Sequence, residues 1–241
     1  MNFDVHAGEL TCIVGGNGAG KTTALMTAAG VFSPYRGKVK YRGKPISTFR
    51  KDKGSAGKIG VLVQNPLCCF VMDSVAEELE ATAKAYKLPR SGIEEVIDIM
   101  QLQSVLNSNP YDISGGELQR AAIAKLLLPE PEVIFLDEAT KGMDAFFKAE
   151  FGALLRRLAA RGTAIVLVSH DIEFCAEFAD RCAMFFNGTV IAEGTPQEVF
   201  LGNSFYTTSA CRISRGIIPD ALTSEQVIDY ANRCERKKND A

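Results

Sequence analysis

Short apolar runs separated by amphipathic stretches give this chain an alternating pattern. The clearest apolar runs are 10–14, 59–63, 133–136, 164–168 and 182–186. Runs of this length and composition are typical of strands buried on both faces of a parallel sheet. Between them, apolar residues recur at helical spacing, most clearly over 145–161. The alternation predicts an α/β fold, a mostly parallel sheet with helices on both faces.

Local signals predict where further elements begin. Two Ser-x-x-Glu sequences, 74–77 and 91–94, fit the capping box that opens a helix. Asn187–Gly188 predicts a tight hairpin in which Thr189–Ala192 pairs back onto the preceding run. Asn2–His6 alternates apolar and polar residues, so it predicts one more strand in a strand pair.

A glycine-rich turn connects the first apolar run to a helix that starts near Lys21. It fills the pattern Gly-x-x-x-x-Gly-Lys-Ser/Thr. Glycines let the backbone N–H groups face an anion, and the positive end of the helix adds to the attraction. Lys21 can reach the β- and γ-phosphates, and the Thr22 hydroxyl suits Mg²⁺. The predicted nucleotide-binding residues of this turn are Gly15, Asn17, Gly18, Gly20, Lys21, Thr22 and Thr23.

Polar residues also follow two other apolar runs. Asp137 and Glu138 come directly after 133–136, and His170 comes after 164–168. Parallel strands present their carboxyl ends at one edge of a sheet, so these residues should meet the glycine turn there. Asp137 can hold Mg²⁺, and Glu138 can orient or deprotonate an attacking water. Two acids after a strand are often only surface residues; the neighbouring phosphate site favours the catalytic interpretation.

Composition narrows the class of protein. The chain has 241 residues, 46% of them hydrophobic, which is enough for one large domain or a domain with a lobe. A net charge of −2 argues against nucleic acid as a main partner. No apolar run approaches the roughly 20 residues of a membrane span. The seven cysteines show no Cys-x-x-Cys spacing, so we expect reduced thiols in a cytosolic protein.

The order of the motifs resembles the nucleotide-binding domain of ATP-binding cassette (ABC) ATPases. Besides the glycine turn and the acidic strand, the chain has Gln64, the sequence SGGELQR at 114–120, Asp144 and His170 in the family's order. The resemblance covers about residues 2–200. It implies a P-loop NTPase fold with a helical signature subdomain, about 70–128, and a small antiparallel β part. Residues 201–241 then form a short helical tail.

The resemblance also implies a role for each motif. Gln64 would contact Mg²⁺ and the attacking water, and His170 would contact the γ-phosphate of ATP. The loop at 114–117 would cap the ATP of a second subunit, which gives a head-to-tail dimer, and Asp144 would bridge its two sites. The implied residues are, for catalysis, Glu138, His170 and Gln64; for the metal, Thr22, Gln64 and Asp137; and for ATP across the dimer, Ser114, Gly115, Gly116, Glu117 and Asp144.

A narrower resemblance is to energy-coupling-factor ATPases, which drive the uptake of vitamins and transition-metal ions. It rests on Gln64-Asn65-Pro66, the glutamate at 117, the segment 194–200 and the segment 202–208. It implies a transmembrane coupling protein, a membrane substrate-binding protein and a cytoplasmic location on the inner face of the membrane. Ala139, where the family usually has proline, and Met143, where it usually has leucine, depart from the pattern.

The family's adenine-stacking aromatic residue has no counterpart here. It stands well upstream of the glycine turn, where this chain has only fourteen residues before Gly15, and Phe3 is too close. We therefore expect a chain that is truncated at its start or is the second half of a fused tandem ATPase. Without the stacking we expect weak ATP affinity and poor base discrimination, a loss of roughly 1–3 kcal/mol.

Two other functions are open. A soluble ABC ATPase acting on nucleic acid or the ribosome would carry a long coiled-coil insertion or a second cassette with a charged linker, and neither is in the sequence. A nucleotide-dependent dimerisation module without turnover would not need Lys21, Asp137, Glu138 and His170, which are all present.

Overall fold

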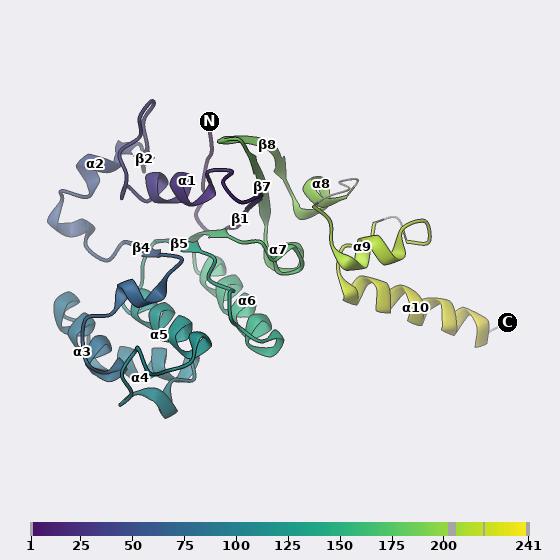
Figure 1. The fold of residues 1–241 in the computed structure, drawn as a ribbon. Coiled ribbons are helices and arrows are strands. Elements are labelled where there is room, and N and C mark those ends of the chain that lie inside the picture. The colour runs from purple at the N-terminus through teal and green to yellow at the C-terminus, as the bar shows by residue number, and fades with distance from the viewer. Residues whose placement is uncertain (1, 202–205, 219, 240–241) are drawn as a thin grey trace.

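The computed structural model describes residues 2–201, 206–218 and 220–239. Its centre is a six-stranded sheet in the order β4-β5-β6-β1-β7-β8 (Figure 1). Neighbouring strands are parallel except β7 and β8, which form an antiparallel hairpin. The strands are β1 (Leu10–Gly15), β4 (Ile59–Leu62), β5 (Val133–Asp137), β6 (Ala164–Val168), β7 (Arg181–Phe186) and β8 (Thr189–Gly194), and a separate pair holds β2 (Lys40–Tyr41) and β3 (Lys44–Pro45).

Helices cover both faces of the sheet, as predicted. The helices are α1 (Lys21–Ala28), α2 (Ile46–Phe49), α3 (Val75–Tyr86), α4 (Arg90–Ile99), α5 (Gly115–Leu127), α6 (Ala145–Ala160), α7 (Ile172–Phe178), α8 (Pro196–Phe200), α9 (Ser209–Ser214) and α10 (Ser224–Asn239). Successive strand residues alternate between two cores. Ile13 belongs to the core against α1, whereas Cys12 belongs to the larger core that contains Phe151 of α6. The α/β fold with a mostly parallel sheet is therefore confirmed.

The helices α3, α4 and α5 pack together beside the sheet (Figure 1). Ser74 caps α3, accepting a hydrogen bond from the backbone N–H of Glu77 at 3.2 Å, which is the serine half of the predicted capping box. The second predicted capping box, at 91–94, is wrong. Pro89 stands at the N-cap of α4, and its ring fixes a φ of −72°, so the helix begins at Arg90, ahead of Ser91.

The predicted strand over Asn2–His6 is also wrong. Residues 2–6 form no strand and belong to neither of the two sheets in the described part of the chain. Their apolar side chains are still used, because Phe3 and Val5 pack against the core of α1. The Phe3 ring meets Phe185 edge-on, with centroids 6.3 Å apart.

The hairpin between β7 and β8 forms where the sequence predicts it. Asn187 and Gly188 have positive φ values of 47° and 75°, the conformation that a tight two-residue hairpin requires. Strand β8 continues to Gly194, two residues beyond the predicted end.

The segment after α8 carries α9 and α10, which lie to one side of the sheet in Figure 1. The backbone N–H of Ser209 donates to Glu173 on α7 at 2.6 Å, which joins this segment to the main body. Residues 202–205, part of the 202–208 motif, lie outside the described residues. A domain boundary near residue 200 stays a prediction. No helix in the described ranges is both long and apolar enough to cross a membrane.

Candidate functional site

The glycine turn after β1 wraps around the side chain of Lys21. Gly15, Gly18 and Gly20 have φ values of 149°, 76° and 94°. A Cβ at Gly15 would lie 2.3 Å from the carbonyl oxygen of Phe185, so no larger residue fits there. The Lys21 ammonium group donates to the carbonyl oxygens of Gly15 at 2.9 Å and Gly16 at 3.0 Å. These carbonyls hold the ammonium group inside the loop, close to where a phosphate would lie.

The predicted polar clusters meet at this edge of the sheet. Strand β6 lies between β5 and β1, so the residues that follow these three strands are neighbours. Nε2 of His170 is 3.2 Å from a carboxylate oxygen of Glu138 and 3.5 Å from Nζ of Lys21. Glu138 has a positive φ of 56°, an unfavourable conformation that its hydrogen bond to Val168 helps to hold.

Glu138 and His170 line an open cleft of about 560 Å³. Its walls are Asn17, Gln64, Glu138, Thr140, Lys141, Gly142, Lys148, His170 and Asp171. Clefts of this size are common for small-molecule ligands. Charges of both signs face it, so an anionic ligand with a bound cation would be complementary to the walls.

Burial shifts the pKa of the charged groups around the cleft. It lowers the pKa of Lys21, against the opposing attraction of Glu138 and Asp137. It raises the pKa of Glu138, although the nearby His170 and Lys21 partly oppose the rise. A carboxylate whose pKa is raised binds a proton more readily, as a general base should.

Asp137 is the most unusual group at the site. Its side chain is 1% exposed, and neither carboxylate oxygen has a hydrogen-bond partner among the described residues. Burial raises its pKa, and the nearby Thr22, Lys21 and His170 oppose the rise only in part. A buried carboxylate with free oxygens beside a hydroxyl is a donor set that fits Mg²⁺.

The predicted signature loop lies outside this cleft. Ser114 and Glu117 form a complete capping box: the Ser114 N–H donates to the Glu117 carboxylate at 2.9 Å, and the Glu117 N–H donates to the Ser114 hydroxyl at 3.3 Å. The hydrogen bonds from Ser114 hold the pKa of Glu117 below its usual value. A Cβ at Gly116 would lie 3.1 Å from the carbonyl oxygen of Gly142, so the loop borders the cleft without lining it.

Two other predicted residues are also placed apart from the cleft walls. Asp144 caps α6 by accepting the backbone N–H of Phe147 at 2.8 Å. Thr23 is exposed on the first turn of α1. The roles of all the predicted site residues stay predictions, since geometry alone places them but does not test them.

Sequence reasoning missed three residues near the cleft. Lys148, one turn after Asp144 on α6, forms an ion pair with Asp171 at 2.5 Å. The hydroxyl of Thr140 lies 3.3 Å from that of the fully buried Ser169. The Tyr206 hydroxyl would lie 3.4 Å from a Cβ at Gly16. No local pattern in the sequence indicates these contacts: Lys148 and Asp171 are 23 residues apart, and Thr140 and Ser169 are 29 apart.

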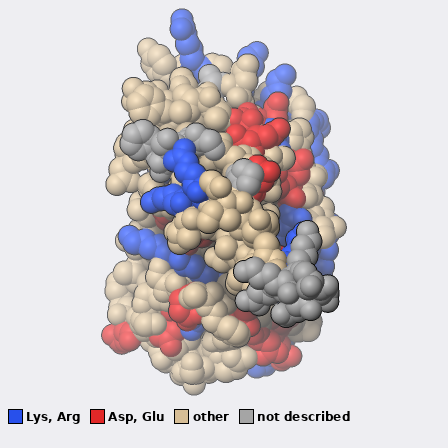
Figure 2. Space-filling model, turned by 90° about the vertical axis from the view of Figure 1, so that its right-hand side faces the viewer, with Lys and Arg blue, Asp and Glu red and all other residues tan. Residues whose placement is uncertain are grey.

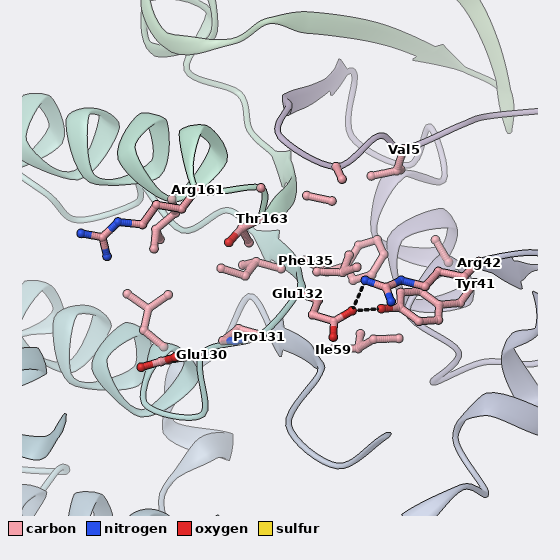
Figure 3. Close-up of a pocket in the computed structure, with 18 of the residues that line it drawn as sticks. Val5, Tyr41, Arg42, Ile59, Glu130, Pro131, Glu132, Phe135, Arg161 and Thr163 are labelled. Atoms are coloured by element: carbon pink, nitrogen blue, oxygen red, sulfur yellow. Dashed lines mark hydrogen bonds and ion pairs between the residues drawn. The ribbon is translucent and has the colours of Figure 1, made fainter. Parts of the chain in front are cut away.

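A second cavity, of about 910 Å³, lies at the opposite edge of the sheet, where β4, β5 and β6 begin. Figure 3 shows Glu132 joined to Tyr41 and Arg42 at this cavity. Lys58 completes the cluster at 2.9 Å. Burial and the bond to Glu132 raise the pKa of Tyr41 to about 12. These contacts tie the small β2–β3 sheet to β5, on the far side from the phosphate loop.

The phosphate loop, the acidic strand end and the histidine define the class of protein, a P-loop nucleotide-binding protein. The profile of the ABC transporter family matches residues 1–141. The chain belongs to the ABC transporter family and carries its ATP-binding domain.

Individual relatives and solved structures agree with this assignment. A Bacillus thuringiensis protein described as an ABC transporter ATP-binding protein is 39% identical over 95% of this chain and 42% of its own length. This chain thus spans less than half of that relative. The energy-coupling factor transporter ATP-binding protein EcfA of Methanocaldococcus jannaschii is 34% identical over 83% of this chain and 74% of its own length.

The similar solved structures share the fold over most of the chain. The structure of cbiO1 from Clostridium perfringens, part of the ABC transporter complex cbiONQ, has a TM-score of 0.72, with 30% identity over 83% of this chain and 82% of that chain. The ATP-binding cassette MJ0796, a dimer in a post-hydrolysis state bound to ADP and Pi, has a TM-score of 0.70, with 26% identity over 81% of this chain and 88% of that chain.

Proposed function

We propose that this chain binds and hydrolyses ATP as the ATPase part of an energy-coupling-factor importer for a vitamin or a transition-metal ion. The observation that carries the ATPase proposal is the meeting of Lys21, Glu138 and His170 where β1, β5 and β6 end. The similarity to EcfA and to cbiO1 supports this kind of importer.

ATP hydrolysis transfers the γ-phosphoryl group to water, so the protein acts mainly by positioning and by neutralising charge. When ATP binds, Lys21 exchanges the carbonyls of Gly15 and Gly16 for phosphate oxygens. Glu138 accepts the proton of the attacking water, and His170 lies close enough to orient the Glu138 carboxylate. Thr22, Asp137 and Gln64 would hold Mg²⁺, which neutralises phosphate charge when bound.

A second ATPase subunit or domain completes each site in this proposal. The N-terminus of α5, with its capped Ser114–Glu117 loop, borders the cleft but does not line it. That helix end can attract the phosphates of a nucleotide held by another subunit. The similar cassette MJ0796 is a dimer with ADP and Pi bound, which supports a pair of ATPase units. In the head-to-tail arrangement that we propose, Asp144 would lie between the two sites.

Membrane proteins are the further partners in this proposal. Val71, Met72 and Tyr111 are 81%, 42% and 72% exposed, and neighbouring exposed apolar side chains often mark an interaction surface. Their segments are neighbours, because Val75 donates its N–H to the carbonyl of Ser108. A transmembrane coupling protein, with a membrane substrate-binding protein, would cover this surface on the inner face of the membrane. Figure 2 shows both signs of charge across one face of the molecule. The net charge of −2 gives no reason to add nucleic acid to the proposed partners.

The substitution Glu138→Gln tests the proposal. It keeps the shape of the site but removes the base, a loss of about 3 kcal/mol or 100-fold in turnover. We expect the variant to bind ATP, to hydrolyse it barely, and to accumulate as an ATP-bound dimer in size-exclusion chromatography. Lys21→Ala is the control that should lose binding as well. Hydrolysis by Glu138→Gln well above that of Lys21→Ala would contradict the proposal.

A further inference from the structure

A partly buried ion pair outside the cleft joins three parts of the helical region. The Glu78 side chain, on α3, is 2% exposed and lies 2.5 Å from the ammonium group of Lys125 on α5. Glu78 also accepts the backbone N–H groups of Val71 and, at 2.7 Å, Met72. One carboxylate therefore connects α3, α5 and the segment at 71–72.

Lys125 makes a second connection to the same segment. Its ammonium group donates to the carbonyl oxygen of Cys69 and lies 5.7 Å from the centroid of the Phe70 ring. The cation thus holds residues 69–70, and its carboxylate partner holds 71–72. Burial alone would raise the pKa of Glu78, but the bonds from Lys125, Val71 and Met72 outweigh it and lower the pKa. Glu78 is therefore ionised at neutral pH.

The anchored segment lies between two features of the proposed ATPase. Gln64, on the cleft wall, comes five residues before Cys69. Val71 and Met72 form part of the exposed apolar surface. At the other end of α5 is the Ser114–Glu117 loop. Replacing an ion pair inside a protein with apolar residues of the same size often leaves the stability unchanged. Such a pair is therefore better explained by a role in fixing one arrangement of the elements that it joins.

We propose that Glu78 and Lys125 are a positioning pair that holds the Gln64 loop and the exposed Val71–Met72 surface in fixed relation to the signature loop on α5. The proposal rests on the proposed ATPase function. A partner that displaces Val71 and Met72 would also displace Glu78, because their backbone N–H groups donate to its carboxylate. Through the ion pair with Lys125, α5 would move with Glu78. ATP turnover should therefore depend on the pair more than ATP binding does, because the phosphate loop lies against a different core.

Three variants and one control separate positioning from simple stability. Lys125→Met removes the cation but keeps an apolar side chain of similar length. Lys125→Arg keeps a cation with donors for Glu78 and for Cys69. The double variant Glu78→Gln/Lys125→Met removes both charges, so no charge is left buried without a partner. Lys58→Met is the control: it breaks a more exposed lysine–glutamate ion pair, to Glu132 at the opposite edge of the sheet, and Arg42 still pairs with Glu132.

The measurements are kcat with Mg²⁺-ATP, the Kd for ATP and the melting temperature. A nitroxide label on the exposed Cys68 reports the mobility of the anchored segment. For this label Cys69, Cys211 and Cys234 are changed to serine; Cys12, Cys175 and Cys182 are buried and do not react. The mobility of the label reports directly on the anchored segment and does not depend on ATP hydrolysis.

We expect Lys125→Met and the double variant to lower kcat at least fivefold, to change the Kd for ATP less than twofold, and to make the label more mobile. Lys125→Arg and Lys58→Met should stay within twofold of the parent in kcat. Recovery of kcat together with melting temperature in the double variant would show a purely structural pair and overturn the inference. An unchanged label in Lys125→Met would overturn it too. Absence of ATP hydrolysis in the parent protein would instead reject the proposed function, and the label would still test the anchor.

Discussion

At the scale of single residues, two neighbouring carboxylates differ in what they contact. Glu138 has His170 within 3.2 Å, whereas the oxygens of Asp137 have no hydrogen-bond partner in the described part of the chain. Without a cation, Asp137 is a carboxylate that folding removes from water, and the nearby Thr22, Lys21 and His170 offset the cost of that burial only in part. The site is therefore built for a bound state, at a cost to the stability of the nucleotide-free protein.

The substitution Asp137→Asn should consequently stabilise the nucleotide-free protein. Burial raises the pKa of Asp137 in the folded state, so its protonated form is favoured there and the ionised form is disfavoured. The contribution of Asp137 to the free energy of unfolding is therefore largest at low pH, and it is lost as the pH rises through the raised pKa. At pH 7 we expect a gain of about 1–2 kcal/mol in the free energy of unfolding, measured with urea in EDTA. The gain should vanish near pH 3; equal or lower stability at pH 7 would refute this account of the site.

A second prediction concerns the glycine at the end of β1. Gly15→Ala places a Cβ 2.3 Å from the carbonyl of Phe185, in a backbone conformation with φ of 149°. We expect a loss of about 2–4 kcal/mol in urea unfolding, because the β1–β7 pairing must shift. Gly18→Ala is the matched control: φ is 76°, but nothing lies within 4 Å, so the cost should be about 1 kcal/mol. Equal costs for the two variants would mean that the close contact does not matter.

The residues of the phosphate loop were predictable because anion binding dictates each residue type by itself. The positive φ of Glu138 and the ion pair between Lys148 and Asp171 were not, since each depends on how β5, α6 and α7 pack. The same holds for Glu78 and Lys125, which are 47 residues apart in the sequence. Long-range polar pairs leave no local pattern.

At the scale of elements, the buried strands were predicted best. A fully apolar run such as Ala164–Val168 has one favourable arrangement, a central parallel strand, and the structure has β6 there. The misplaced elements were at the surface, where local signals compete. Asn2–His6 alternates like a strand but has no pairing partner in the described chain, and Pro89 overrides the cap signal of Ser91.

The packing of α6 against α7 gives a prediction at this scale. A Cβ at Gly152 would lie 2.6 Å from three atoms of the Phe178 ring. Gly152→Ala should therefore destabilise the protein by about 1–3 kcal/mol despite the better helix propensity of alanine. Gly92→Ala on α4 meets only Leu128 at 3.6 Å and should stabilise it by about 0.5–1 kcal/mol. The midpoints of thermal unfolding should move in opposite directions, and a gain for Gly152→Ala would contradict the packing.

At the scale of the whole molecule, the structure brings together the strand ends that the sequence predicts to meet, and it leaves the Ser114–Glu117 loop outside their cleft. The ends of β1, β5 and β6 converge because parallel strands share one edge. The Ser114–Glu117 loop lies at the cleft's border, beside Gly142, and not in its walls. One chain thus holds the phosphate loop, Glu138 and His170 together, whereas its Ser114–Glu117 loop lies outside the cleft walls, as the proposal of a shared nucleotide site requires.

Complementation between two inactive variants tests whether the site is shared. Lys21→Ala removes the phosphate-binding lysine, and Ser114→Arg blocks the signature loop with a bulky cation. In a head-to-tail dimer of one of each, one site has both defects and the other has neither. Because half of the dimers in an equal mixture are mixed, activity should return to about a quarter of the parent's. If each chain held a complete site of its own, mixing would restore nothing, and the proposal of a shared nucleotide site would have to be abandoned.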